Sequence, residues 1–461
     1  MVNISIETTR KRRTPYATKE LNQFTSEEIR SYQEVLLQKQ LKRAVRNSEY
    51  YRRIFRELGV NVNSIKTLED FRKLPPFMNK DLERESQRLS FEKEGHPFGE
   101  HLLVKPDQIA FTGTTSGTSG TPTFTYTFTE RDIRTMNKYI RNMLEYGGIY
   151  KGDRLLFSHS LGIYATSSIL FGVREHGVLP IDVDVRAGSD MILKYAQMSR
   201  PEGAMMTPSL AEYLVDRAPQ LTGQEVGDLG LNALFTVGEI GIGIPEIKRK
   251  IETAYKCRVY DYLGEFGFSC DSEEYHGIHA VAPDLVLFSE DLVDPETKQP
   301  IQVEDGVVGE VILTELSLEG LPRIRYASGD LVQVFTEQCP GCGFTGPRLK
   351  VVGRSDDLLI VKGVNVYPSA IKKVVASFDE MLTGEFRIVL DSPPPRVVPP
   401  LVLKVEHREG VQKTDLGYIE DILKSALHRE LRITPDIDWV GAGTLKKQLT
   451  KTPLFEKCYE G

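Results

Sequence analysis

Thr-Gly-Thr-Thr-Ser-Gly-Thr-Ser-Gly-Thr-Pro-Thr, residues Thr112–Thr123, is the stretch from which the fold of this chain can be inferred. It holds three glycines, eight hydroxyl residues and no charged residue. The next segment, Phe124–Phe128, alternates aromatic residues with threonine and predicts a strand. Glycines let backbone N–H groups converge on one point, and hydroxyls add further donors for phosphate oxygens. The stretch therefore indicates a phosphate-binding loop, with a flexible surface turn as the alternative.

This loop differs from the kinase-type phosphate loop, which ends in Gly-Lys followed by Ser or Thr. The chain around it has 461 residues, of which 40% are hydrophobic and 27% are charged. Such a length predicts two or three domains. A net charge of −7 does not indicate nucleic acid or an anionic membrane as partner. We find no apolar run of membrane-spanning length and no signal-peptide core, and we expect a cytoplasmic protein.

Helical and extended patterns alternate after the loop. The expected helices are Thr129–Glu145, Ser168–Glu175, Met191–Gln197 and Ile244–Tyr255, and the expected strands are Arg154–Ser158, Val178–Val185, Gly203–Thr207, 235–237 and Arg258–Tyr262. This alternation predicts a parallel sheet with helices on both faces, whose ligands bind at the carboxyl ends of the strands. The loops 158–162 and 207–209 lie at those ends. His159 in the first loop is a candidate for ligand contact or for a structural hydrogen bond.

The rest of the chain changes character twice. Residues 24–90 are helical and charged, and residues 280–335 predict a β-rich subdomain. After residue 354 the pattern is that of a small α+β domain. We therefore predict an α/β protein in two parts. Residues 1–354 form a large N-terminal domain with mixed and parallel sheets flanked by helices, and residues 355–461 form a small mobile domain.

The order Thr-Ser-Gly-Thr-Ser-Gly-Thr-Pro-Thr resembles the phosphate loop of the adenylate-forming enzymes, most closely that of the phenylacetate–CoA ligase branch. The resemblance implies that the nucleotide phosphates contact Thr115, Ser116, Gly117, Thr118, Ser119 and Gly120. The family usually carries a lysine near the end of this loop. Here Thr121 and Thr123 occupy the candidate positions, so the phosphate charge must be met by other groups.

Further motifs follow in the family's order. Gly238-Glu239 resembles the segment that packs beside the adenine, although a glycine for close strand–helix approach is an equal explanation. Glu265 matches the glutamate that holds magnesium, while Gly264 stands where the family has a hydroxyl residue. Asp330, in Tyr326-Ala-Ser-Gly-Asp, matches the aspartate that binds the ribose hydroxyls.

The boundary of the small domain carries the last part of this resemblance. Arg354 would contact the nucleotide, and Asp356 would be the hinge. Aligned from Gly443, Lys451 falls on the catalytic lysine, with Lys447 as the alternative. The acyl-substrate pocket would be bordered by His159 and Tyr164.

The implied reaction has two halves. A carboxylate attacks the α-phosphorus of ATP to give an acyl-adenylate and pyrophosphate, and the thiol of CoA then displaces AMP to give a thioester. The implied substrate is an aromatic or arylacetic acid. An adenylating enzyme that does not use CoA, acting in nucleotidyl transfer or amide synthesis, is the first alternative. A catalytically silent nucleotide sensor is the second. The oligomeric state stays open, and a homodimer is compatible with the sequence.

Cys339-Pro-Gly-Cys342 has the spacing and the flanking glycine of a zinc knuckle. Cys270 and His279 are the candidates for the other two ligands, with His276 as the fallback. In the zinc-bearing members of the resembled branch, a cysteine and the histidine of a Gly-x-His follow the magnesium glutamate. We expect a structural zinc site, against a redox pair or two unpaired thiols as alternatives.

Overall fold

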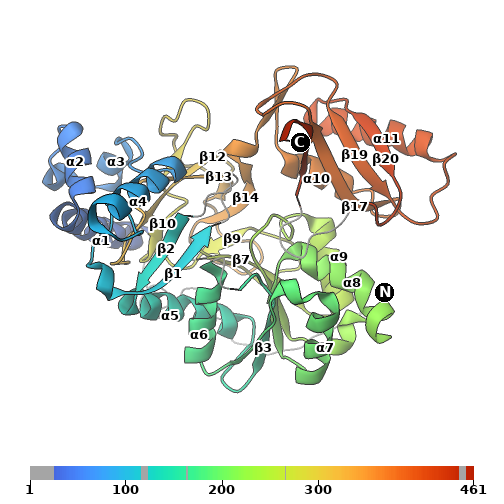
Figure 1. The fold of residues 1–461 in the computed structure, drawn as a ribbon, viewed down its shortest axis with the longest axis horizontal. Coiled ribbons are helices and arrows are strands. Elements are labelled where there is room, and N and C mark those ends of the chain that lie inside the picture. The colour runs from blue at the N-terminus through green and yellow to red at the C-terminus, as the bar shows by residue number, and fades with distance from the viewer. Residues whose placement is uncertain (1–24, 116–122, 162–164, 265, 446–452, 461) are drawn as a thin grey trace.

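A long mixed sheet runs through the larger part of the molecule (Figure 1). The computed structural model describes residues 25–115, 123–161, 165–264, 266–445 and 453–460. Within these residues the sheet has 12 strands. Its parallel half has the order β4-β3-β5-β6-β7. The bounds are β3 Arg154–Phe157, β4 Leu179–Asp182, β5 Gly203–Met206, β6 Ala233–Thr236 and β7 Arg258–Leu263.

The β-rich segment continues this sheet rather than forming a separate one. β7 pairs antiparallel with β8, and the order then runs β8-β9-β14-β13-β12-β10, with β11 paired to β12. The bounds are β8 Gly267–Ser269, β9 Ile278–Ala280, β10 Val286–Leu287, β11 Leu292–Val293, β12 Val308–Glu315, β13 Tyr326–Phe335 and β14 Arg348–Arg354. One sheet thus joins the parallel strand ends to the strands that carry Asp330 and Arg354.

The threonine- and glycine-rich stretch lies across the connection of a separate hairpin. β1 (Ile109–Thr115) pairs antiparallel with β2 (Thr123–Thr129), and Thr115 is opposite Thr123. The predicted strand at Phe124–Phe128 is therefore confirmed, and the hairpin holds both ends of the loop at a fixed separation.

Helices cover the sheet on both sides, as Figure 1 shows. The side chains of Thr25 and Thr129 are N-caps, because each accepts from the third helical residue in a capping box, and the second begins the predicted helix at Thr129. Residues 207–209 are not a loop as predicted, since Thr207 caps a helix with Pro208 at its first position. The bounds are α1 Ser26–Asn47, α2 Glu49–Glu57, α3 Leu68–Arg72, α4 Lys80–Glu94, α5 Glu130–Tyr146, α6 Ile169–Glu175, α7 Ser189–Ser199, α8 Pro208–Thr222 and α9 Pro245–Tyr255.

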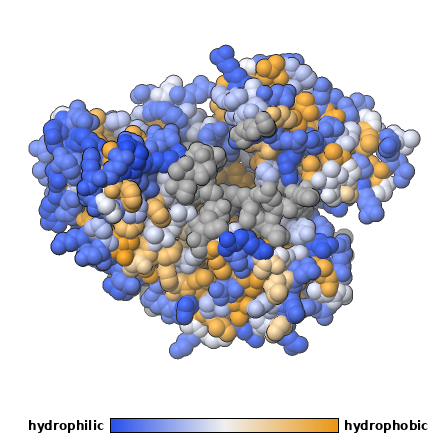
Figure 2. Space-filling view, in the orientation of Figure 1, coloured by the Kyte–Doolittle hydropathy of each residue, from blue (hydrophilic) through white to orange (hydrophobic). Residues whose placement is uncertain are grey.

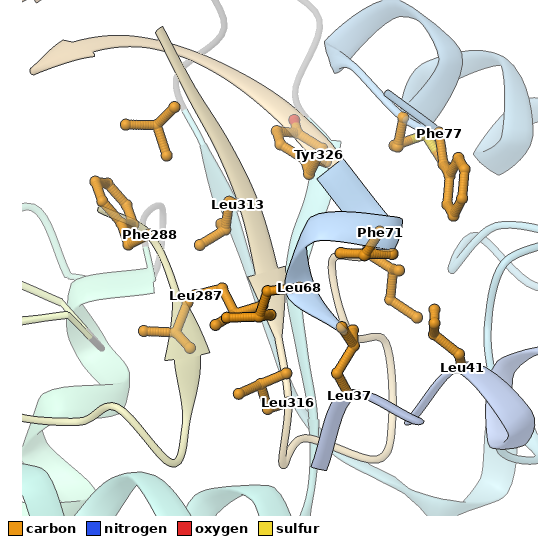
Figure 3. Packing of buried hydrophobic residues seen from close by; sticks show 14 of the residues in the cluster. Leu37, Leu41, Leu68, Phe71, Phe77, Leu287, Phe288, Leu313, Leu316 and Tyr326 are labelled. Atoms are coloured by element: carbon orange, nitrogen blue, oxygen red, sulfur yellow. The ribbon is translucent and has the colours of Figure 1, made fainter. Parts of the chain in front are cut away.

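The N-terminal helices are held on the sheet by a buried apolar cluster (Figure 3). Leu37, Leu41 and Phe71 pack toward Leu287 and Leu313 of the antiparallel half. Burial of such side chains contributes roughly 1.5–3 kcal/mol each. This packing fixes α4, which follows directly, against the sheet.

The C-terminal part has a core of its own, built from residues between Leu359 and Ile433. It lies over one end of the long sheet (Figure 1). A short 3₁₀ helix, Ser355–Asp357, connects β14 to it. The bounds are β15 Leu359–Val361, β16 Val364–Val366, α10 Pro368–Ala376, β17 Leu382–Leu390, β18 Arg396–Val397, β19 Val402–His407, α11 Leu416–Leu431, β20 Asp436–Val440 and β21 Phe455–Lys457.

The surface is hydrophilic over the N-terminal helices, and apolar side chains gather in the lower part of the same view (Figure 2). Among the described residues, no helix combines the length and the apolar composition needed to cross a membrane.

Candidate active site

The hairpin β1–β2 places the ends of the phosphate-loop stretch beside the segment that follows His159. Gly113 lies against Ala165, and a Cβ on Gly113 would come within 2.8 Å of the Ala165 Cα. A side chain at position 113 would therefore push the hairpin away. The end of β1 and the segment that begins at Ala165 are thereby held next to each other.

The loop after β3 lies at the carboxyl edge of the parallel strands. Ser158 donates its N–H to the Met205 carbonyl at 2.9 Å and its hydroxyl to the Val183 carbonyl at 3.1 Å. The imidazole of His159 is buried beside the Phe157 ring, with 4.9 Å between the ring centroids. Its Nε2 has no hydrogen-bond partner among the described residues. Burial lowers the pKa of His159 to about 4, so the ring is neutral at pH 7.

A glycine follows the carboxyl end of β6. Gly238 has φ of +103°, and a Cβ there would meet only the Thr207 Cγ2 at 3.9 Å. Backbone conformation, and not close strand–helix approach, therefore requires glycine at this position. The next residue, Glu239, accepts the Ser209 N–H at 2.8 Å and so caps the start of α8.

Asp330, Arg354 and Asp356 are joined by ion pairs where the sheet meets the C-terminal part. Asp330 on β13 is opposite Arg354 on β14, and its Oδ1 lies 2.9 Å from the Arg354 Nη1. The Arg354 Nε donates to Asp356 Oδ1 at 2.8 Å. Gly329 has φ of +78°, and a Cβ there would come within 2.9 Å of the Arg354 Nη2. The side chains of Asp330 and Arg354 are 33% and 41% exposed, so a ligand can reach both.

Three cysteines and a histidine converge at the other end of β14. The ligand atoms of Cys270, His279, Cys339 and Cys342 all lie within 4.8 Å of one another. Cys342 Sγ is 3.2 Å from His279 Nε2, while His279 Nδ1 lies 3.2 Å from the Gly277 carbonyl. That second contact orients the ring so that Nε2 offers its lone pair to the cluster. His276, the fallback ligand, is not part of this set.

Two comparisons bear on the family. The family model described as the AMP-binding enzyme C-terminal domain matches residues 363–455. A phenylacetate–coenzyme A ligase of Thermus thermophilus is 28% identical over 377 residues, which are 79% of this chain and 78% of that protein. The chain is similar to phenylacetate–CoA ligases over most of its length, and its C-terminal part matches the AMP-binding model. The motifs predicted this resemblance, and the comparisons confirm it.

Solved structures of a 2-hydroxyisobutyryl-CoA ligase share the fold of this chain. Its postadenylation state matches with a TM-score of 0.85 and 25% identity, over 98% of this chain and 94% of that chain. Its thioesterification state matches with a TM-score of 0.66 and 25% identity, over 95% and 91%. The arrangement of the two parts of this chain is therefore closer to the first of these states.

Part of the predicted site falls outside the described residues. These positions are Ser116, Gly117, Thr118, Ser119, Gly120, Tyr164, Glu265, Lys447 and Lys451. Of Thr115, only the backbone in β1 is described. Among the predicted residues within the described ranges, the structure joins Asp330 to Arg354 and Asp356, and it brings the four cysteine and histidine ligands together.

Sequence reasoning missed the polar face of α4. Lys80, Glu83 and Gln87 contact the start of β2 or the sheet, although they precede the loop by more than 25 residues. The one signal in the sequence was Asn79, a good N-cap, directly before Lys80. That signal predicts where the helix starts, but it does not predict what the helix touches.

Proposed function

We propose that this chain is an AMP-forming acid–CoA ligase acting on an aromatic or arylacetic acid. A carboxylate oxygen of the acid attacks the α-phosphorus of ATP, and the bond to the bridging oxygen breaks to release pyrophosphate. The CoA sulfur then attacks the acyl carbon, AMP leaves with the anhydride oxygen, and the thiol proton passes to solvent. The observation that supports this proposal best is the Asp330–Arg354–Asp356 group. In this group, the residues that match the family's ribose-binding aspartate, nucleotide-binding arginine and hinge residue are neighbours, which supports the proposal.

The first half-reaction joins two anions, so this chain must supply positive charge and hydrogen-bond donors around the phosphates. The threonine-rich loop supplies N–H and hydroxyl donors. Arg354 adds a cation next to the proposed ribose ligand Asp330, at 2.9 Å. We assign the remaining charge to Lys451, with Lys447 as the alternative. Magnesium, held by Glu265, would neutralise phosphate charge when bound.

His159 and Tyr164 border the proposed acyl pocket. His159 supports this assignment because its neutral imidazole is buried against Phe157 at the carboxyl edge of the sheet. The unpartnered Nε2 of His159 is available for one polar group of an otherwise apolar acid. Gly238 and Glu239 stand at the next strand end, where we place the adenine. The reduced cysteine cluster fits a cytoplasmic location, and a homodimer remains a prediction.

Incubation with ATP, magnesium and CoA tests the function. We expect pyrophosphate release with at least one member of a panel of aromatic, arylacetic and short aliphatic acids. Mass spectrometry should then detect the CoA thioester. Adenylate without thioester would favour the CoA-independent enzyme, and an absence of pyrophosphate with every acid would favour the nucleotide sensor. Reactions without CoA, or without the acid, are the controls.

We also propose that Cys270, His279, Cys339 and Cys342 hold one structural zinc ion. Three thiolates and one imidazole form a set that suits tetrahedral zinc, and they leave no position open for a substrate. The ligands come from the turns after β8 and β13 and from β9. A bound ion would therefore tie these strands together at one end of β14 and stabilise the half of the sheet that carries Asp330.

Cys339→Ser should lose the metal and lower the stability of the protein. Purified wild-type protein is expected to contain about one zinc per chain by metal analysis. The loss of unfolding free energy should be roughly 4 kcal/mol where free zinc stands roughly a thousand-fold above the Kd. Cys458→Ser is the matched control, because Cys458 is exposed and lies outside the cluster. A metal-free wild-type protein that unfolds at the same temperature as Cys339→Ser would rule the site out.

A further inference from the structure

The phosphate-loop stretch carries no charged residue, although it must hold a triphosphate if the proposed function is right. A cation from another part of the chain lies where the loop ends. Lys80 is the first residue of α4, and its Nζ donates to the Thr125 Oγ1 at 2.7 Å. Thr125 is in turn 3.0 Å, oxygen to oxygen, from Thr123, the last residue of the stretch.

One face of α4 contacts the start of β2. Lys80, Glu83 and Gln87 follow each other at helical spacing, so they share that face. Glu83 is 1% exposed, and its Oε2 lies 3.1 Å from the Lys80 Nζ. The same oxygen accepts the Tyr326 hydroxyl at 3.0 Å. The ion pair with Glu83 thereby holds the Lys80 ammonium next to the strand. The Lys80 side chain is 29% exposed.

Gln87 is a second observation that points to a ligand. Its Oε1 accepts the Phe124 N–H at 3.1 Å, which aligns the amide along the start of β2. Its Nε2 is buried and has no partner within the described parts of the chain. A buried donor without a partner is costly, and an incoming acceptor would satisfy it. A cation and a spare donor thus lie on one face of α4, about two turns apart, against the start of β2.

We propose that Lys80 supplies the cation that the phosphate loop lacks and binds the outer phosphates of ATP, which leave as pyrophosphate. The position along β13 favours the outer phosphates over the α-phosphate. Lys80 is linked through Glu83 to Tyr326, and Asp330 stands four residues further on. At ~3.3 Å per residue along the strand, Tyr326 and Asp330 are at most roughly 13 Å apart. This separation is compatible with a nucleotide whose ribose binds Asp330 and whose outer phosphates reach Lys80.

Separate titrations of ATP and AMP distinguish this role from a structural one. In Lys80→Met, ATP should bind about 10- to 100-fold more weakly, the loss expected for one charged hydrogen bond. AMP binding should stay unchanged, because AMP lacks the outer phosphates. Lys80→Arg should retain most of the ATP affinity. Pyrophosphate release should fall in Lys80→Met, whereas thioester formation from a supplied acyl-adenylate should persist.

Two matched variants serve as controls. Thr125→Val removes the hydrogen bond that tethers Lys80 to β2 but keeps the cation, so it should cost much less ATP affinity than Lys80→Met. Lys73→Met removes a nearby exposed lysine outside the site and should leave binding of both nucleotides unchanged. Equal weakening of ATP and AMP, an unchanged ATP affinity, or equal effects of Thr125→Val and Lys80→Met would each overturn the proposal.

A crystal of the wild-type protein with a non-hydrolysable ATP analogue provides a test that needs no variant, should Lys80→Met fail to fold. The Lys80 Nζ should lie within hydrogen-bond distance of an outer phosphate oxygen. A triphosphate whose outer oxygens lie elsewhere would refute the assignment. This inference rests on the proposed function, but the two fail separately. If the wild-type protein forms no thioester, the proposed function is wrong. If the wild-type protein forms the thioester but Lys80→Met does not weaken ATP binding more than AMP binding, only the inference about Lys80 is wrong.

Discussion

Lys451→Ala should slow acyl-adenylate formation by about 10²–10³-fold, the loss typical of one preorganised group that stabilises charge in the transition state. It should leave thioester formation from a supplied acyl-adenylate nearly unchanged. Attack on the α-phosphorus by an anion adds negative charge to the α-phosphate oxygens in the first half-reaction, and we expect the ammonium to act in that step. Pyrophosphate release with ATP and acid measures the first step, and conversion of a synthetic acyl-adenylate with CoA measures the second.

The flanks of the Lys451 segment explain why the two steps should separate. On one side, the buried Leu445 donates its N–H to the Glu406 carboxylate of β19 at 2.7 Å. On the other side, β21 pairs in parallel with β17, and Phe455 is opposite Ile388. Both anchors belong to the C-terminal part. We therefore expect the two steps to respond differently if the C-terminal part is positioned for adenylation in the first step only.

Lys447→Ala is the matched comparison, because it lies in the same segment and is the alternative catalytic lysine. If Lys447→Ala shows the separation of the two steps and Lys451→Ala does not, the catalytic lysine is Lys447. Equal loss of both steps in Lys451→Ala would contradict a role confined to adenylation. Circular dichroism of each variant distinguishes such a result from a folding defect.

The sequence predicted local structure best where the signals were themselves local. Thr129 was predicted as the start of a helix, and it forms a capping box with Asp132, which lies three residues away. The start of α8 was missed for a related reason. Thr207-Pro208-Ser209 has a turn-like composition, yet proline at the first helical position is equally typical. Turn residues alone do not distinguish these two outcomes.

Contacts between segments far apart in the chain could be predicted from the sequence only where a family motif identified the residues. The family motifs marked Asp330 and Arg354, and the structure joins these residues across β13 and β14. His276 and His279 could not be told apart, because the choice depends on which ring faces the loop at Cys339. Lys80 carried no motif of its own. Its contact with Thr125 spans 45 residues and depends on the packing of α4 against β2.

Asp356→Pro should do the reverse of Lys451→Ala, abolishing thioester formation while sparing acyl-adenylate formation. Asp356 lies in the short 3₁₀ helix that joins β14 to β15, between the sheet and the separate C-terminal core. Proline fixes φ near −65°, so a hinge at this position could no longer rotate. Across the two solved states of the 2-hydroxyisobutyryl-CoA ligase, the TM-score with this chain falls from 0.85 to 0.66. Such a difference is expected if the C-terminal part moves as a body between the half-reactions.

Asp356→Ala separates the hinge from the ion pair. The side chain of Asp356 accepts from the Arg354 Nε at 2.8 Å, and both substitutions remove that bond. Only proline also restricts the backbone, so Asp356→Ala should keep thioester formation measurable while Asp356→Pro loses it. The same two assays, pyrophosphate release and conversion of a synthetic acyl-adenylate, are run on both variants. If alanine and proline impair the second step equally, the ion pair to Arg354 is what matters, and the C-terminal part does not turn about residue 356.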